Sequence, residues 1–154
     1  MLNPHFQPMV DTLFRHDVTV DKFVGDAGPA VFGSPEPDPQ RYANAVRAAL
    51  ARQEAVQAET QLRAVRGDVT CRVRIGIHCG EVFHGFVGTN DRLEFTVIRD
   101  AVNQTCRYCE AASEGEILIS QDIFQRVFNL VKAENISLQT KEGDLTSYRI
   151  LGLR

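Results

Sequence analysis

The pattern of hydrophobic and polar positions predicts a chain of helices and strands joined by short connections. Between residues 3 and 16, apolar side chains recur every three or four positions, which predicts an amphipathic helix. Residues 18–24 are rich in β-branched side chains, and residues 27–33 are their expected partner strand. Gly25-Asp26 between them suits a two-residue hairpin turn.

The middle of the chain predicts one long helix and one strand. An alanine-rich stretch at 40–65 predicts a helix that starts at Asp38-Pro39, as N-cap and first helical residue, and stops at Gly67. Strict alternation at 71–82 predicts a half-buried strand with one apolar face. The residues on that face are Cys71, Val73, Ile75 and Ile77.

The second half of the chain continues the alternation of elements. Gly80, Gly85, Gly88 and Asn90-Asp91 mark a hairpin-like excursion. The expected strands are 93–98, 116–119, 136–138 and 146–151, and the expected helices are 100–112 and 121–129. The last two strands would form a hairpin around Glu142-Gly143-Asp144. Hairpins mixed with crossover helices predict an α+β fold with helices packed on a sheet.

Composition narrows the class of protein but does not point to a particular reaction or ligand. A chain of 154 residues with 44% apolar and 24% charged residues is expected to form one globular domain, residues 1–154. The net charge of −3 gives no reason to expect a nucleic-acid partner, and no apolar run is long enough to insert in a membrane. The four cysteines show no disulfide-scaffold spacing, and the start lacks a signal-peptide pattern, so we expect a cytoplasmic location.

Three segments together carry a family resemblance. They are VDKFVGDAGPAVFG (20–33), RIGIHCGEVFHGFVG (74–88) and RLEFTVIRDAVNQTCRYCEAA (92–112), and GEILIS (115–120) follows them. In this order and spacing, the chain resembles the catalytic domain of class III nucleotide cyclases, the adenylate and guanylate cyclases. The resemblance implies a ferredoxin-like βαββαβ core with extra strands, helices on a mostly antiparallel sheet, and a head-to-tail homodimer with two composite active sites.

The resemblance also implies a reaction and a set of ligands. The ribose 3′ oxygen of ATP would attack the α-phosphate, giving 3′,5′-cyclic AMP and pyrophosphate with the help of two Mg²⁺ or Mn²⁺ ions. Asp26 matches a metal ligand of the family, and a carboxylate suits these ions. Lys22 and Thr96 match the residues that bind the purine, and this pair favours adenine. The alternative is a surface lysine, a turn aspartate and a strand threonine.

Asn103 and Arg107 match the asparagine and arginine that act on the transition state. They lie four residues apart, one turn of the predicted helix, so they share a face. An amide and a guanidinium suit a ribose and a transferring phosphate. The alternative is a solvated helix in which Arg107 pairs with Glu110. Val102, Cys106 and Cys109 would form the separate apolar face of this helix.

Other polar residues carry weaker signals. His78 lies in a stretch that the family uses structurally, so we do not expect it to act as a general base. Cys106 and Cys109 have the spacing of a metal pair but lie within one predicted helix, so buried thiols are favoured over zinc. Arg92 recurs in the family before its strand, without an assigned role.

The sequence also departs from the family pattern. The family's first strand, which bears the first metal-binding aspartate, and the phosphate loop after it are not present in these residues. Arg99 replaces a glycine, and the triphosphate lysine is either displaced to Lys141 or lost. We therefore expect weak or no activity from this chain alone, with a regulatory domain in a longer protein compatible with the resemblance. Two alternatives stay open: a degenerate cyclase-homology module for dimerisation or nucleotide sensing, and an unrelated ferredoxin-like ligand-binding domain.

Overall fold

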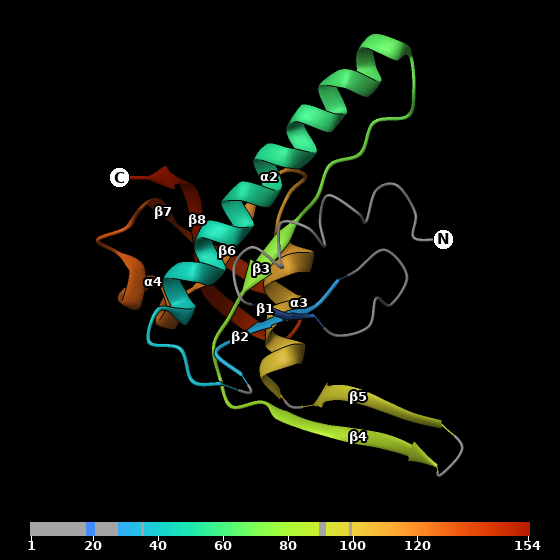
Figure 1. The fold of residues 1–154 in the computed structure, drawn as a ribbon. Coiled ribbons are helices and arrows are strands. Elements are labelled where there is room, and N and C mark those ends of the chain that lie inside the picture. Colours follow the sequence, from blue (N-terminus) through green and yellow to red (C-terminus); the bar gives the residue numbers. More distant parts are fainter. Residues whose placement is uncertain (1–17, 21–27, 35, 90–91, 99) are drawn as a thin grey trace.

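A four-stranded sheet forms the centre of the molecule (Figure 1). The computed structural model describes residues 18–20, 28–34, 36–89, 92–98 and 100–154. The sheet has the strand order β3 (Ile75–Ile77), β6 (Ile117–Ser120), β8 (Gly143–Leu153) and β7 (Val131–Thr140). β3 and β6 are parallel, whereas the other two pairs are antiparallel. The expected α+β architecture on a mostly antiparallel sheet is confirmed.

Helices cover both faces of this sheet. On one face, α2 (Arg41–Arg66) and α4 (Gln121–Val127) pack against Ile117 and Ile119 of β6. On the other face, α3 (Asp100–Ala111) packs through Tyr108 against Leu118, the residue between them. All four residues of β6 are buried, because successive side chains of a strand point to opposite faces and each face has its own helix layer.

The strand at 71–82 is shorter than predicted, although the residues of β3 are half-buried as expected. Only Ile75–Ile77 forms β3, and Cys71 is exposed instead of facing the core. A Cβ atom at Gly76 would collide with the backbone of Cys109 and Thr105 in α3. The alternation was misleading here because Gly76 marks the face on which α3 packs closely, not a face open to solvent.

The ends of α2 confirm one prediction and correct another. Gly67 terminates the helix in the left-handed conformation, at φ 76°, as predicted from its position. The residue at the N-cap position is Gln40, not Asp38. Asp38 still caps the start from outside the helix, because its carboxylate accepts hydrogen bonds from the Gln40 amide (2.8 Å) and Asn44 Nδ2 (3.0 Å).

The closing hairpin is much longer than the sequence pattern indicated. β7 and β8 pair from Val131–Leu153 to Thr140–Gly143, so the turn consists of Lys141 and Glu142. The sequence pattern predicted the turn slightly later, around Gly143, and did not predict that residues 131–135 belong to the strand. These residues alternate between the core and water at the edge of the sheet, and Lys132 and Glu134 are exposed.

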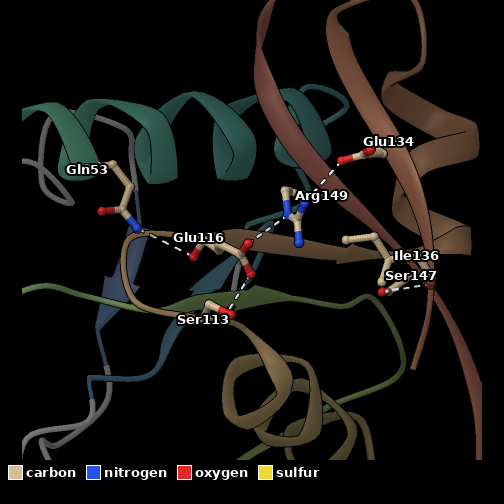
Figure 2. A network of polar contacts seen from close by, with 7 residues as sticks. All are labelled: Gln53, Ser113, Glu116, Glu134, Ile136, Ser147 and Arg149. Atoms are coloured by element: carbon tan, nitrogen blue, oxygen red, sulfur yellow. Dashed lines mark hydrogen bonds and ion pairs between the residues drawn. The ribbon is translucent and has the colours of Figure 1, made fainter. Parts of the chain in front are cut away.

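A polar network fixes the connection from α3 into β6 (Figure 2). Glu116 accepts a hydrogen bond from the Ser113 amide (2.9 Å), and its other carboxylate oxygen lies 2.7 Å from Arg149 Nε. That second contact is an ion pair only, since the Nε–H is not aimed for a hydrogen bond. Arg149 Nη1 donates to Glu134 (3.1 Å), and Gln53 Nε2 of α2 donates to the Val73 carbonyl (2.8 Å) and, at 3.5 Å, to that of Glu116. The network therefore joins α2, β7 and β8 at the start of β6.

Two separate hairpins complete the described structure. β1 (Val18–Val20) pairs with β2 (Ala30–Phe32), as predicted, and β2 begins directly after Pro29. β4 (Phe83–Thr89) pairs with β5 (Arg92–Ile98) in the excursion that the glycines indicated, and this hairpin projects away from the sheet (Figure 1). The predicted helix at 3–16 and the Gly25-Asp26 turn lie outside the described residues.

Arg52 on α2 is a charged residue in a largely buried environment that solvates its charge poorly, and its replacement gives a testable prediction. Burial lowers the pKa of Arg52 to about 10, and its buried Nε has no hydrogen-bond partner in the described structure. Arg52→Met keeps the length of the side chain and removes the desolvated charge, so we expect the free energy of unfolding to rise by about 1 kcal/mol. Urea unfolding of the wild type, Arg52→Met and Arg52→Ala tests this. A loss of stability in Arg52→Met equal to that of Arg52→Ala would contradict it.

Candidate active site on helix α3

The candidate site is built on α3, which follows β5 along the chain and lies against the sheet. Its buried residues are Ala101 and Tyr108, and Ala112 directly after it is buried as well. On the side toward β3, Cys109 contacts the Gly76 backbone closely. This packing on two sides fixes the rotation of the helix and leaves one face toward solvent.

Asn103 and Arg107 lie on the part of α3 that the core does not cover. Asn103 is exposed, and the Arg107 side chain keeps 34% of its surface accessible. Because they are four residues apart on one helix, their side chains emerge on the same face. The described structure thus brings the amide and the guanidinium together as predicted, on a surface that another molecule can reach.

The structure gives Arg107 a partner that the sequence did not suggest. Arg107 Nη2 forms an ion pair with a carboxylate oxygen of Glu142, in the turn between β7 and β8. The alternative considered from the sequence was Glu110, one turn along the same helix. Glu142 and Arg107 are distant in the sequence and are brought together only by the fold. The sequence signal that could have suggested this contact is weak: Glu142 is an acidic residue in the charged turn Lys141-Glu142.

Of the other predicted site residues, the structure describes only the backbone of Thr96. Lys22 and Asp26 lie outside the described residues, within the connection from β1 to β2. Thr96 lies in β5 opposite Gly85, in the projecting hairpin, and only its backbone is described. The clustering of Lys22, Asp26 and Thr96 with Asn103 and Arg107 across two copies of the chain therefore stays a prediction.

The secondary candidates are placed as follows. Arg92 begins β5 opposite Thr89, Arg99 lies outside the described residues, and Lys141 is exposed in the β7–β8 turn. Cys106 is exposed, so the expectation that it belongs to an apolar core face is wrong, whereas Cys109 is half-buried. The buried stripe of α3 runs through Ala101 and Tyr108 instead.

His78 lies behind α3 and serves packing. Its ring stacks on Tyr108, with centroids 5.7 Å apart, and its Nδ1 is buried without a hydrogen-bond partner in the described structure. Burial lowers the pKa of His78, which favours the neutral ring at pH 7. The structure agrees with a structural role.

The described part of the chain does not contain a full set of metal ligands. Among those residues, no three histidine, cysteine, aspartate or glutamate side chains gather where they could hold an ion. Asp26 is outside them, so the metal site rests on the resemblance and on the suitability of a carboxylate for a hard cation.

The helices of the described structure are too short or too polar to cross a lipid bilayer.

Comparisons with known proteins identify the family of this domain. The model of the adenylate and guanylate cyclase catalytic domain matches residues 1–152. Rv1318c of Mycobacterium tuberculosis, an uncharacterised protein, is 37% identical over 78% of this chain and 21% of its own length. Adenylate cyclase 1 of Rhizobium meliloti is 28% identical over 99% of this chain and 24% of its own. The chain thus spans about a fifth to a quarter of the curated relatives that it matches.

Solved structures show the same fold. The guanylyl cyclase Cya2 has a TM-score of 0.91 and 28% identity, covering 99% of this chain and 79% of that one. The adenylyl cyclase CyaB from P. aeruginosa has a TM-score of 0.89 and 25% identity, covering 99% of this chain and 81% of that one. These matches agree with the expected ferredoxin-like cyclase fold. The chain therefore belongs to the adenylate and guanylate cyclase catalytic-domain family.

Proposed function

We propose that two copies of this domain, arranged head to tail, bind ATP between them and convert it to 3′,5′-cyclic AMP and pyrophosphate in the cytoplasm. The observation that carries the proposal is the accessible face of α3 in a cyclase-family fold, where Asn103 and Arg107 lie one turn apart. An exposed amide and a partly exposed guanidinium with this spacing suit a ribose and a phosphate group.

Each residue has one assigned task in this scheme. Asn103 positions the ribose, and Arg107 donates hydrogen bonds to the phosphate oxygens, where negative charge builds up during the reaction. Lys22 and Thr96 bind the adenine ring. Asp26 of the other copy would hold Mg²⁺ or Mn²⁺, which when bound would lower the pKa of the attacking hydroxyl and neutralise phosphate charge.

The β4–β5 hairpin supports the dimer. It pairs with no further strand in the described structure, and its first residue, Phe83, keeps 68% of its surface exposed. An isolated two-stranded hairpin is marginally stable in water, so contact with a second copy would stabilise it. Thr96 lies in this same hairpin, which would place it against the partner's cleft.

We expect low turnover from this chain by itself. The 154 residues contain one of the family's two metal aspartates and no phosphate loop before the first predicted helix. A degenerate module that binds nucleotide without turnover is the second candidate, and the departures from the family pattern at Arg99 and Lys141 favour it. Cyclic AMP production by this chain and by an N-terminally extended form, with Mn²⁺ and ATP, separates the two functions. An extended form that binds ATP without forming product would favour the module.

Nucleotide preference gives the sharpest test of the two base-binding residues. Lys22 and Thr96 together favour adenine, so we expect cyclic AMP formation from ATP to exceed cyclic GMP formation from GTP by at least about tenfold, since unmatched polar groups in a base pocket are strongly disfavoured. Guanylate cyclases usually carry glutamate and cysteine at these two positions, so the double change Lys22→Glu with Thr96→Cys should lower this ratio. Preference for GTP in the unchanged chain would contradict the assignment.

A further inference from the structure

The ion pair between Arg107 and Glu142 puts a carboxylate where the proposed function puts a phosphate. Arg107 Nη2 contacts Glu142 Oε2, and the two side chains are 34% and 62% exposed. A guanidinium engaged with one carboxylate has fewer N–H groups to offer to a second anion. Glu142 is therefore in a position to compete for Arg107.

The turn that carries Glu142 is well ordered by its own hydrogen bonds. The Thr140 hydroxyl donates to the Gly143 carbonyl (2.8 Å) and accepts from the Glu142 amide (3.3 Å). Gly143 takes φ 119°, a conformation that favours glycine, so the two-residue turn closes tightly. These bonds fix the backbone of Glu142 even though its side chain reaches solvent.

The hairpin behind this turn is packed onto α3. Leu138 and Leu145 pair directly across β7 and β8, two residue pairs before the turn. Both pack against the cluster of Tyr108, Ala112 and Leu118. Tyr108 is the neighbour of Arg107 in sequence, so the apolar contact that seats the hairpin also brings its tip to the guanidinium.

We propose that Glu142 is a built-in competitor of the nucleotide: it holds Arg107 in the unbound protein, and a phosphate group of ATP must displace it. The proposal rests on the proposed function, since it assumes that Arg107 is the phosphate-binding arginine. A phosphate offers more negative charge and a two-point contact to the guanidinium, so the exchange is favourable once ATP is bound. Partly exposed ion pairs are weak, which keeps the penalty on ATP binding to about 1.5- to fivefold.

The test compares two changes that remove the same charge from the same hairpin. Glu142→Gln removes the competitor, and Asp144→Asn, two residues further on and also exposed, is the matched control. With Mn²⁺ and a fluorescent ATP analogue, we expect Glu142→Gln to lower the dissociation constant by about 1.5- to fivefold, and Asp144→Asn to change it much less. In an Arg107→Gln background, Glu142→Gln should have no further effect.

The outcomes distinguish the competitor from the proposed function. Equal affinities of the wild type and Glu142→Gln would overturn the competitor and leave the proposed function standing. Equal gains from Glu142→Gln and Asp144→Asn, or a gain that persists with Arg107→Gln, would also overturn it, because the effect would then be general charge. Failure of every variant to bind the analogue would overturn the proposed function itself.

Discussion

Mixing Asp26→Ala chains with Arg107→Ala chains is expected to restore activity that neither variant has alone. In the proposed head-to-tail dimer, each site takes Asp26 from one copy and Arg107 from the other. A homodimer of either variant lacks one group in both sites, and removing a donor to the transition state lowers turnover by about 10²- to 10³-fold. A mixed dimer has both changes in one site and an unaltered second site.

The size of the recovery follows from random exchange of subunits. Half of the dimers in an equal mixture are mixed and each has one intact site, so roughly a quarter of wild-type activity should return. Formation of cyclic AMP from ATP with Mn²⁺ measures it. The matched control mixes Asn103→Ala with Arg107→Ala, which lie on the same helix and should give no recovery. Recovery in the control, or none in the test mixture, would rule out a cleft shared in this way.

Gly76→Ala is expected to destabilise the protein by about 3 kcal/mol, because the added methyl group has no room. Its Cβ would press on the Cys109 amide nitrogen and lie 2.7 Å from the Thr105 carbonyl oxygen. These are backbone atoms of α3, which cannot rotate aside as a side chain would, so the helix must move off β3. That movement also displaces Asn103 and Arg107, and we expect weaker ATP binding although Gly76 lies outside the proposed site.

Gly115→Ala is the control for Gly76→Ala. Gly115 has φ 80°, and a Cβ there would meet nothing within 4 Å. Its replacement adds backbone strain of about 1 kcal/mol without a steric clash. Urea unfolding should therefore rank Gly76→Ala as clearly less stable than Gly115→Ala. Equal losses would show that α3 can shift at little cost.

The sequence was informative where local periodicity decides the structure. The positions of α2 and α3, and the pairing of Asn103 with Arg107 on one face, follow from helical spacing alone. β3 was overextended because an alternating pattern cannot distinguish a glycine that faces water from Gly76, which faces a helix. The early residues of β7 were missed because a partly solvated edge strand carries polar side chains that resemble a loop.

Contacts between segments that are distant in the sequence could not be predicted from the pattern of hydrophobic and polar residues. The ion pair of Arg107 with Glu142 depends on how the β7–β8 hairpin packs across α3, and no spacing rule encodes that contact. The same holds for the composite site, since Lys22 and Asp26 lie outside the described residues. Their roles rest on the family resemblance, and the mixing experiment tests Asp26 directly.

The length of β8 has a mechanical consequence. Its 11 residues run from the turn beside Arg107 to the C-terminal end, about 36 Å at the rise of an extended strand. At that far end, Arg154 Nε donates to the carbonyls of Phe128 and Val131, both at 3.0 Å, and so clamps the strand to the start of β7. β8 thus connects the end of the sheet at Arg154 to the turn beside Arg107, and a displacement of its last residues would be passed along the strand to α3.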